Sequence, residues 1–378
     1  MDEYFDQEKV GACVMRPVDE AELAGMVRDA AGPLRIVGGG TRAIGAVTGE
    51  VLETGGLAGI TLYEPGALTL VAKAGTPLAD VEAALANEGQ RLAFEPSDMR
   101  ALLGRKGTAT IGGMVAANAS GPRRVAVGAC RDFLLGARFV DGQGSVIKNG
   151  GRVMKNVTGY DLARLMSGAH GTLGVLSEVS LKVLPMPEVS VTLRADGLDA
   201  GRAIEALSGA LGSPYDVSGA AHIVGGALML RLEGFEASVA YRAKELMAHL
   251  AGFGAFSLDP DADWAAIRDV REFGDLAGDV WRISVAPSAA ADVLARIDAT
   301  RAICDWGGGL IFALVEGGRD LRRDLGAMAG HATLMRADEA TIARLGAFHP
   351  EAAGNAALTA GLRARFDPRG ILNSGLMG

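Results

Sequence analysis

The chain has 378 residues, enough for two or three domains, and 49% of them are hydrophobic, which excludes a disordered protein. Its formal net charge of −8 argues against a nucleic-acid partner, because phosphates would need a basic face. The three cysteines are Cys13, Cys130 and Cys304, and their wide spacing argues against a zinc site, a disulfide scaffold or an iron–sulfur cluster held by this chain alone.

No segment has the pattern of a targeting sequence or a membrane span. The N-terminus, Met1 to Asp6, is acidic and lacks a signal-peptide core. No uninterrupted apolar run reaches the roughly 18 residues that a transmembrane helix needs. We therefore expect a cytoplasmic protein without direct insertion into a membrane.

The N-terminal half alternates between helical and strand-like patterns. Apolar residues recur at helical spacing after Asp19, which is a plausible N-cap, and Asp141-Gly142 is a strong signal for a hairpin turn. The prolines of Pro185-Met186-Pro187 mark the best domain boundary. We predict helices over 19–31, 77–89 and 161–167, and strands over 34–37, 68–74, 133–140, 145–148 and 175–184.

A near-repeat follows this boundary. Its first copy has a strand over 189–194, a helix over 201–211, strands over 220–224 and 227–233, a helix over 236–250 and a strand over 255–258. The second copy has the same order over 280–286, 288–300, 302–305, 310–316, 319–328 and 332–336. Each copy is a ferredoxin-like βαββαβ pattern, and two of them side by side would form one antiparallel sheet with helices on one face.

Three consecutive glycines, 38–40, follow the strand predicted over 34–37. Glycine reaches positive φ and lets a ligand approach the backbone, and successive exposed N–H groups form a concavity that suits a phosphate. A second glycine-rich segment, 110–121, would form the other wall of a dinucleotide site. The first segment also fits the Rossmann fingerprint, but Gly45 and Gly49 follow where a Rossmann loop must open a helix, so we disfavour that interpretation.

These segments resemble the vanillyl-alcohol-oxidase-type (PCMH-type) FAD-binding family. The pyrophosphate-loop sequence and four further motifs occur in the order and spacing of that family, at 36–41, 96–98, 110–113, 117–122 and 171–178. Three other runs, 151–162, 330–334 and 371–375, are similar to the FAD-binding E subunits of bacterial glycolate oxidases. The resemblance covers essentially the whole chain.

The resemblance implies an α+β fold in three parts. The first is a PCMH-type FAD-binding domain over residues 1–187. The second is an α+β cap domain of two ferredoxin-like βαββαβ units over 188–336. The third is a helical C-terminal tail over 337–378, which would pack back on the FAD domain.

The resemblance also implies which residues bind FAD. They are Val37, Gly38, Gly39, Gly40, Thr41, Arg42, Pro96, Thr110, Gly112, Gly113, Asn118, Ser120, Gly121, Gly174, Val175 and Asn373. Residues 38–42 would wrap the pyrophosphate with backbone N–H groups, and 110–113 would approach it from the other side at a helix start, where the dipole favours anions. Residues 118–121 would contact the flavin or its ribityl chain.

Gly174 and Val175 would contact the adenine or the ring system by their backbone. Asn373 would form a hydrogen bond near the flavin. Four of these motifs also have a structural explanation. These are an ordinary glycine turn, a tightly packed Gly–Gly helix at 112–113, packing at the start of the strand at 174–175, and a simple turn at Asn373.

The resemblance implies non-covalent FAD. Relatives with covalently bound flavin carry a histidine in the pyrophosphate loop where this chain has Thr41. None of the cysteines lies in a tethering motif of the family. We predict no metal site.

The sequence leaves the catalytic residues unassigned. Oxidation of a 2-hydroxy acid needs a cation for the carboxylate, usually arginine, and a base for the hydroxyl proton, usually histidine, while the cofactor accepts the hydride. Related dehydrogenases that act alone carry two histidines around a Gly-Asp-Gly-Asn stretch, which this chain lacks. Its five histidines are isolated and more readily explained as structural; His331, with Arg336 nearby, is the best candidate for a base.

The resemblance implies a FAD-binding subunit of a glycolate oxidase (dehydrogenase) complex that oxidises glycolate and related 2-hydroxy acids to 2-oxo acids. Its partners would be a FAD-containing catalytic D subunit and an iron–sulfur F subunit that receives the electrons. Peripheral attachment to the inner membrane would come through these partners. Two alternatives stay open, namely a non-catalytic assembly subunit with structural FAD and a stand-alone FAD-linked 2-hydroxy acid dehydrogenase.

Overall fold

The computed structural model describes residues 14–152 and 159–377. Three features singled out in the sequence lie outside these residues, namely the acidic N-terminus, Cys13 and positions 153–158 of the 151–162 motif. We call residues 14–187 the N-terminal part, 188–336 the cap and 337–377 the tail.

The N-terminal part contains two small sheets and one sheet of five strands. Its helices are α1 (Glu20–Asp29), α2 (Leu78–Ala86), α3 (Arg100–Leu103), α4 (Ile111–Ala116), α5 (Arg124–Val127), α6 (Cys130–Phe133) and α7 (Leu162–Met166). Its strands are β1 (Leu34–Val37), β2 (Glu50–Glu53), β3 (Ile60–Glu64), β4 (Thr69–Lys73), β5 (Gln90–Arg91), β6 (Leu134–Val140), β7 (Val146–Gly150), β8 (Val175–Lys182) and β9 (Leu184–Pro185).

The strands of the N-terminal part pair in three groups. β1 and β2 are parallel, β5 and β9 are antiparallel, and the large antiparallel sheet has the order β3-β4-β8-β6-β7. No helix follows β1 directly, since the chain runs from the glycines through turns into β2, which confirms that the Rossmann context is missing. The predicted 133–148 hairpin is present as β6 and β7, and the Asp141 side chain accepts hydrogen bonds from two backbone N–H groups within its loop.

Local sequence explains several helix boundaries. The Asp19 side chain accepts a hydrogen bond from the N–H of Glu22 and so caps α1, as the sequence predicts. Asp161 caps α7 in the same way. The predicted helix at Pro77 begins one residue later, at Leu78, because Pro77 has a ψ of 133° and occupies the cap position.

The cap is built on one eight-stranded antiparallel sheet. Its strands are β10 (Val189–Ala195), β11 (Val217–Ile223), β12 (Leu228–Gly234), β13 (Ser257–Leu258), β14 (Asp279–Val285), β15 (Arg301–Asp305), β16 (Leu310–Val315) and β17 (Gly330–Arg336). Its helices are α8 (Ala200–Leu211), α9 (Glu236–His249), α10 (Trp264–Arg268), α11 (Ala290–Ile297) and α12 (Leu321–Leu325), with a short 3-10 turn, η5 (Trp306–Gly308).

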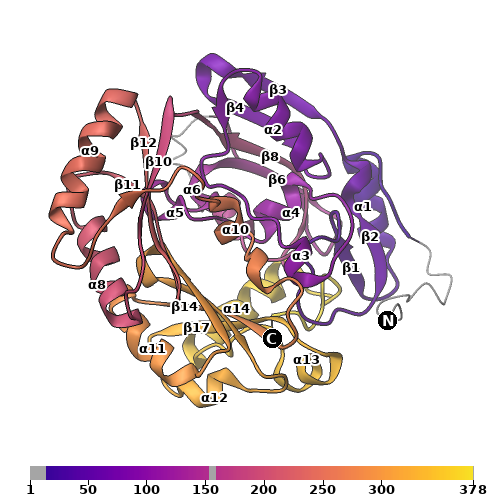
Figure 1. The fold of residues 1–378 in the computed structure, drawn as a ribbon. Coiled ribbons are helices and arrows are strands. Elements are labelled where there is room, and N and C mark those ends of the chain that lie inside the picture. Colours follow the sequence, from indigo (N-terminus) through magenta and orange to yellow (C-terminus); the bar gives the residue numbers. More distant parts are fainter. Residues whose placement is uncertain (1–13, 153–158, 378) are drawn as a thin grey trace.

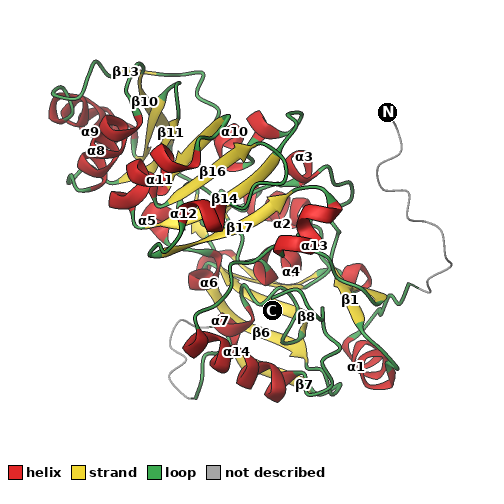
Figure 2. Cartoon of the chain, turned by 90° about the horizontal axis from the view of Figure 1, so that it is seen from below, coloured by secondary structure: helices red, strands yellow, loops and turns green. Residues whose placement is uncertain are grey.

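The order of the cap sheet is β13-β10-β12-β11-β15-β16-β14-β17. Each half of the sheet contains four strands. Read from the outer edge of the sheet inward, each half has its fourth strand in sequence, then its first, third and second. The two halves meet where β11 pairs with β15. Helices α8, α9, α11 and α12 cover the outer face (Figure 1). The inner face packs on α3 and α10, and it faces the N-terminal part (Figure 2).

Side-chain alternation along β14 shows how the two faces differ. Trp281 and Ile283 are buried in the core under the helices, whereas Val280 packs in the cluster on the inner face. Because successive strand residues point to opposite faces, Arg282 and Ser284 lie on the inner face with Val280. The inner face of the sheet therefore presents polar side chains toward the N-terminal part.

The tail contains α13 (Glu339–Leu345) and α14 (Ala353–Phe366). The sequence predicts that the whole tail packs on the FAD domain, and the structure differs at its start. Ala347, just after α13, accepts a hydrogen bond from Leu334 of β17, so this segment lies against the cap. The end of the tail contacts the N-terminal part, where Ile371 accepts a hydrogen bond from the N–H of Leu34.

Candidate functional site

The two glycine-rich segments of the sequence lie directly against one another. A Cβ atom added at Gly39 would overlap the carbonyl oxygen of Thr108, and one added at Gly38 would lie 2.6 Å from Oγ1 of Thr110. The contact of Gly39 is with backbone and that of Gly38 is with the Thr110 hydroxyl, which leaves no room for a side chain at 38 or 39. The structure thus brings the 38–42 loop and the 107–113 segment together.

The glycine loop presents free hydrogen-bond donors. Within the described part of the chain, the backbone N–H groups of Gly38, Gly39 and Gly40 have no acceptor. Gly40 has a φ of +69°, and the nearest atom to a Cβ added there is a Val37 methyl carbon at 3.9 Å, so its side faces open space. Three adjacent free donors beside an open glycine fit a diphosphate, and in this respect the residues fit FAD.

The start of α4 is occupied by its own structure. Thr110 caps the helix by accepting a hydrogen bond from the N–H of Gly113, and the N–H of Gly112 donates to Ala74 at 2.8 Å. A Cβ at Gly112 would lie 2.6 Å from the Cβ of Ala74. Close packing on β4 therefore explains the glycine at 112, and its N–H is already paired.

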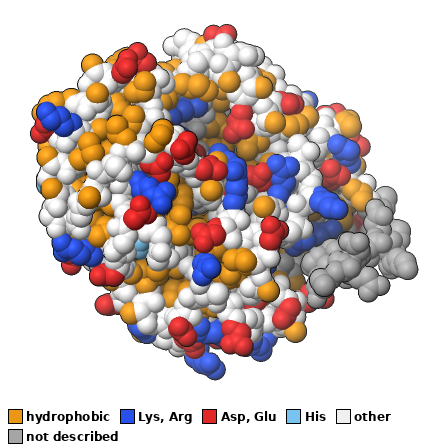
Figure 3. Space-filling model, viewed as in Figure 1, with side chains coloured by type: hydrophobic (Ala, Val, Ile, Leu, Met, Phe, Trp, Pro, Cys, Tyr) orange, Lys and Arg blue, Asp and Glu red, His pale blue; other side chains and the backbone are white. Residues whose placement is uncertain are grey.

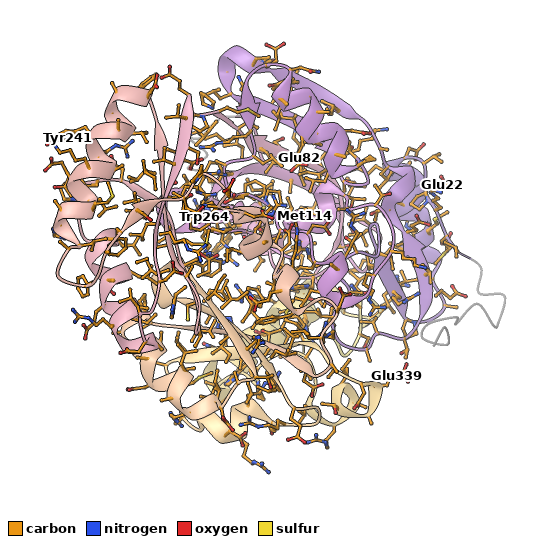
Figure 4. All side chains as sticks on the ribbon, viewed as in Figure 1. Glu22, Glu82, Met114, Tyr241, Trp264 and Glu339 are labelled. Atoms are coloured by element: carbon orange, nitrogen blue, oxygen red, sulfur yellow. The ribbon has the colours of Figure 1, made fainter. Side chains whose placement is uncertain are left out.

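Arg42 connects the glycine loop to residues 96–97. Its guanidinium donates to the carbonyl and hydroxyl oxygens of Ser97, which follows the buried Pro96, and it reaches the sulfur of Met114 at 3.5 Å. Burial lowers the pKa of Arg42 to about 10, and its Nε has no partner among the described residues. Figure 4 labels Met114, which lies toward the middle of the molecule.

The polar side chains of Asn118 and Ser120 are engaged within the N-terminal part. Asn118 has a φ of +47°, and its Oδ1 accepts a hydrogen bond from the N–H of Arg131. The Ser120 hydroxyl accepts from the N–H of Cys130. Gly121 differs, because its carbonyl oxygen accepts a hydrogen bond from the cap, at 3.0 Å from Nε1 of Trp306.

Gly174 and Val175 lie at the start of β8 among core residues. A Cβ at Gly174 would lie 2.7 Å from the ring of Phe139, and Val175 is fully buried in the cluster that contains Leu23 and Leu52. These contacts account for both residues by packing.

Asn373 joins three segments through one side chain. Its Oδ1 accepts a hydrogen bond from the N–H of Ile36 at 2.7 Å, and its Nδ2 donates to the carbonyl oxygen of His170 at 2.8 Å. Its own N–H donates to Leu34 of β1. The side chain therefore holds the strand that leads into the glycine loop, with one hydrogen bond at each end of its amide.

The cap contributes residues that the sequence did not single out. Trp306 follows β15 in the left-handed region, with a φ of +54°, and its indole lies near two arginines from different parts of the chain. The Cζ atom of Arg124 on α5 lies 4.4 Å from the ring centroid, and that of Arg282 on β14 lies 5.4 Å from it. Only the fold brings these positions together, so no sequence pattern pointed to them.

Asp305 lies next to this group. It is buried, and its Oδ1 accepts a hydrogen bond from the N–H of Trp306 at 2.7 Å. Its pKa is raised to about 7, mainly by burial and also by the charge of Glu95, while the hydrogen bond from Trp306 and the charges of Arg231 and Arg282 lower it. Asp305 is therefore a weak counter-charge for the arginines around it at neutral pH.

The charges of these arginines also act on two histidines. His170 has a φ of +50°, and burial together with the charges of Arg42 and Arg282 lowers its pKa to about 4. His331 lies on β17 opposite Ser284, and desolvation, followed by the charge of Arg282, lowers its pKa. Both rings are thus neutral at pH 7, and nearby cations oppose the protonation of either one.

A buried ion-pair network connects the cap to the N-terminal part. Arg231 of the cap donates two hydrogen bonds of 2.9 Å to Glu95, and Glu233 of the cap accepts from Arg123 and Arg91. Burial alone would raise the pKa of Glu233, but the hydrogen bond and charge of Arg123 lower it to about 2. These pairs hold the inner face of the cap sheet against residues 91–123.

On the face of the molecule drawn in Figure 3, acidic and basic side chains are interspersed. In the described ranges, no group of three or more histidine, cysteine, aspartate or glutamate side chains could hold a metal ion. No helix within those ranges is long and apolar enough to cross a membrane.

Comparisons with known proteins point to one family. Residues 11–150 match the family described as FAD binding domain. The chain is 37% identical over 354 residues to "Glycolate oxidase subunit GlcE" of Escherichia coli (strain K12), which covers 91% of this chain and 92% of that protein. It is 36% identical over 132 residues to "Glycolate oxidase subunit GlcD" of Bacillus subtilis (strain 168), which covers 35% of this chain and 25% of that protein.

A solved structure of alkyldihydroxyacetonephosphate synthase resembles the fold. Its TM-score is 0.68 at 15% sequence identity, and the match covers 96% of this chain and 75% of that one. The family match confirms the FAD-binding domain that the resemblance implies, and the solved structure supports the α+β fold.

Proposed function

We propose, from the premise that this chain belongs to the family of glycolate oxidase subunit GlcE, that it binds FAD non-covalently and carries electrons within a glycolate oxidase complex. The single observation that supports this most is the glycine loop. Its three N–H groups have no acceptor among the described residues, one side of Gly40 is open, and residues 107–113 pack against Gly38 and Gly39. Thr41 is buried and offers no imidazole for a covalent bond to flavin.

In this proposal the reaction is oxidation of a small 2-hydroxy acid, such as glycolate, to the 2-oxo acid. When bound, FAD supplies the acceptor for the two electrons that the substrate loses. The chain's own residues hold the pyrophosphate with residues 38–40, place Arg42 near its negative charge and exclude water by closing the cap over the site. An iron–sulfur F subunit would take the electrons onward, and a FAD-containing D subunit would complete the complex.

In the same proposal, the three parts of the chain have different roles. Residues 1–187 form the FAD-binding domain and 188–336 the cap, while the tail supports β1 through Asn373. Of the residues predicted to bind FAD, those of the 38–42 loop have the free donors, and Gly112, Gly174 and Val175 serve the packing that supports them.

A second function has a specific observation in its favour. His170 and His331 both have lowered pKa values, and neither has a carboxylate partner that would orient it as a base, among the described residues. A subunit whose FAD supports assembly and which relies on another subunit for substrate oxidation would show this feature.

The test is the flavin content of the purified chain and of two variants. We expect a stoichiometric FAD absorbance that acid precipitation releases from the protein. The variant Gly39→Val should lose FAD, because its side chain overlaps Thr108, whereas Gly25→Ala, a glycine with nothing within 4 Å of an added Cβ, should retain it. A wild-type chain that folds but contains no flavin, alone or with the other two subunits, would contradict the proposed function.

The same preparations separate the two functions. If the FAD of this chain accepts and passes on electrons during turnover, glycolate should bleach the oxidised flavin of the chain or of the reconstituted complex under anaerobic conditions. If FAD only supports assembly, the flavin of this chain stays oxidised while Gly39→Val fails to join the complex.

A further inference from the structure

Two arginines that face the same indole ring have no anionic partner. Arg124 comes from α5 of the N-terminal part and Arg282 from β14 of the cap, and their guanidinium carbons lie 4.4 Å and 5.4 Å from the centroid of the Trp306 ring. Across residues 14–152 and 159–377, neither side chain makes an ion pair or a hydrogen bond. An aromatic ring attracts a cation, but it does not neutralise two of them.

Other arginines of this interface are paired, whereas Arg124 and Arg282 are half-buried and have no ion pair among the described residues. Arg231 pairs with Glu95, and Arg91 and Arg123 pair with Glu233, at distances between 2.7 and 2.9 Å. Even partial burial of a charge costs free energy unless the charge is paired. Where a protein holds two unpaired cations together at a domain interface, a ligand of opposite charge is the expected partner.

The acidic groups near the pair do not fill this role. The acidic charge that acts on Arg282 is Asp305, whose carboxyl accepts a backbone hydrogen bond from Trp306 instead and has its pKa raised by burial. The one that acts on Arg124 is Asp132, which accepts from the N–H of Ala129 and lies 3.7 Å from Arg164. Both carboxylates are committed elsewhere.

The surrounding backbone holds the indole in one place. Trp306 is in the left-handed region, and glycines follow it at 307 and 308, both with positive φ. Its main-chain N–H donates to Asp305 and its indole N–H donates to Gly121 in the other part of the chain. A non-glycine residue in this conformation costs free energy, so its position depends on these contacts.

The pair also lies on the side of the sheet that faces the glycine loop. Arg282 lies opposite Thr333 of the neighbouring strand β17. It shares the inner face of the sheet with Ser284 and His331. The charges of Arg42, on the glycine loop, and Arg124 both lower the pKa of Arg282, which burial brings to about 10. Arg282 therefore lies on the face of the cap sheet that is turned to the N-terminal part, close enough to the arginine of the glycine loop for its charge to act on it.

We propose that Arg124 and Arg282 bind the carboxylate of a small 2-hydroxy acid or 2-oxo acid beside the ring of Trp306. This inference rests on the proposed function and adds to it that the chain has a substrate site of its own. Arginine suits the role because its planar donor fork matches a carboxylate. Because one arginine comes from each part of the chain, a bound carboxylate would also hold the cap in place.

The experiment is a titration with oxalate, a dicarboxylate that flavin cannot oxidise in this way, followed by isothermal calorimetry and by the flavin absorbance spectrum. Wild-type chain with FAD should bind oxalate saturably. Arg124→Gln and Arg282→Gln should each bind it at least about tenfold more weakly, the loss of one charge-assisted hydrogen bond, and Arg282→Lys should recover part of the affinity. Arg301→Gln, which removes an exposed arginine of the same sheet, is the matched control.

The outcomes separate this inference from the proposed function. Oxalate affinity unchanged in Arg124→Gln and Arg282→Gln overturns the site, and so does a folded wild-type chain that binds no oxalate. Loss of FAD from these variants in proportion to lost oxalate binding also overturns it, because the arginines then hold cofactor phosphate. A chain without FAD refutes the proposed function instead, and calorimetry on that flavin-free chain still tests whether the arginines bind oxalate. Thermal unfolding of each variant shows whether it is folded.

Discussion

The indole N–H of Trp306 donates a hydrogen bond to the carbonyl oxygen of Gly121, at 3.0 Å and across 185 positions of the sequence. It joins the turn after β15 in the cap to the segment that follows α4 in the N-terminal part. A Cβ at Gly121 would lie 2.5 Å from the carbonyl oxygen of Glu95, a residue of the buried ion-pair network. The contact between the two parts therefore depends on a glycine at this position.

The first prediction concerns this contact. Gly121→Ala should lower the free energy of unfolding by about 1–3 kcal/mol, because the new methyl group displaces the Glu95 backbone and strains the hydrogen bond from Trp306. Urea denaturation measures the change. Gly66→Ala, at a glycine with nothing within 4 Å of an added Cβ, should change it little, and an equal loss in both variants would contradict the explanation.

The second prediction concerns acid stability. The pKa of Glu233 is about 2 in the folded chain, below its usual 4.5, so ionised Glu233 stabilises the fold above pH 4.5 and this contribution is lost as the pH falls toward 2. Glu233→Gln should therefore be less stable than wild type at pH 7, and the difference should shrink below pH 4.5. Thermal unfolding from pH 3 to 7 measures it, with the exposed Glu205→Gln as the control.

The third prediction concerns Asp305, where the sign is opposite. Its pKa is raised from 3.8 to about 7, so the stability associated with the protonated form is complete below pH 3.8 and is lost as the pH rises to 7. Asp305→Asn keeps an acceptor for the N–H of Trp306 and has no charge to bury. The variant should gain stability relative to wild type as the pH rises from 4 to 7, and a difference that is constant over this range would refute the burial argument.

The fourth prediction concerns Asn373. Asn373→Ala leaves the N–H of Ile36 and the carbonyl of His170 without their partner, and alanine fits poorly at a φ of +43°. We expect a loss of about 2–4 kcal/mol in unfolding free energy and weaker retention of FAD, because β1 leads into the glycine loop. Asn355→Ala on exposed α14 is the control, and Asn373→Gly, which tolerates this φ, separates the backbone effect from the lost hydrogen bonds.

Much of the fold is predictable from local sequence. The strand before the glycines, the capping aspartates at 19 and 161, and the β6–β7 hairpin all follow from residues within a few positions of one another. Several short elements could not be found in this way, namely β2, β3, α3, α5, α6 and α10. Elements of four or five residues carry too little periodicity, and long-range pairing stabilises them instead.

The candidate site divides in the same way. The sequence points to the 38–42 loop and to segment 110–121 through their glycines, and the structure brings these segments into contact. The polar side chains of Asn118, Ser120 and Asn373 hydrogen-bond with backbone groups of the chain itself, whereas the sequence offers a structural explanation only for Asn373. Hydrogen-bond partners of this kind come from distant positions, so residue type alone does not reveal them.

The sequence by itself determined the FAD-binding family and the loop that serves it, because a glycine run after a buried strand acts through its own backbone. Only the tertiary structure decided which cations lack a partner. Most arginines of the interface are paired, and Arg124 and Arg282 differ from them because the fold gathers both at the ring of Trp306 with no ion pair among the described residues. Burial and pairing are properties of packed neighbours, and these neighbours are far apart along the chain.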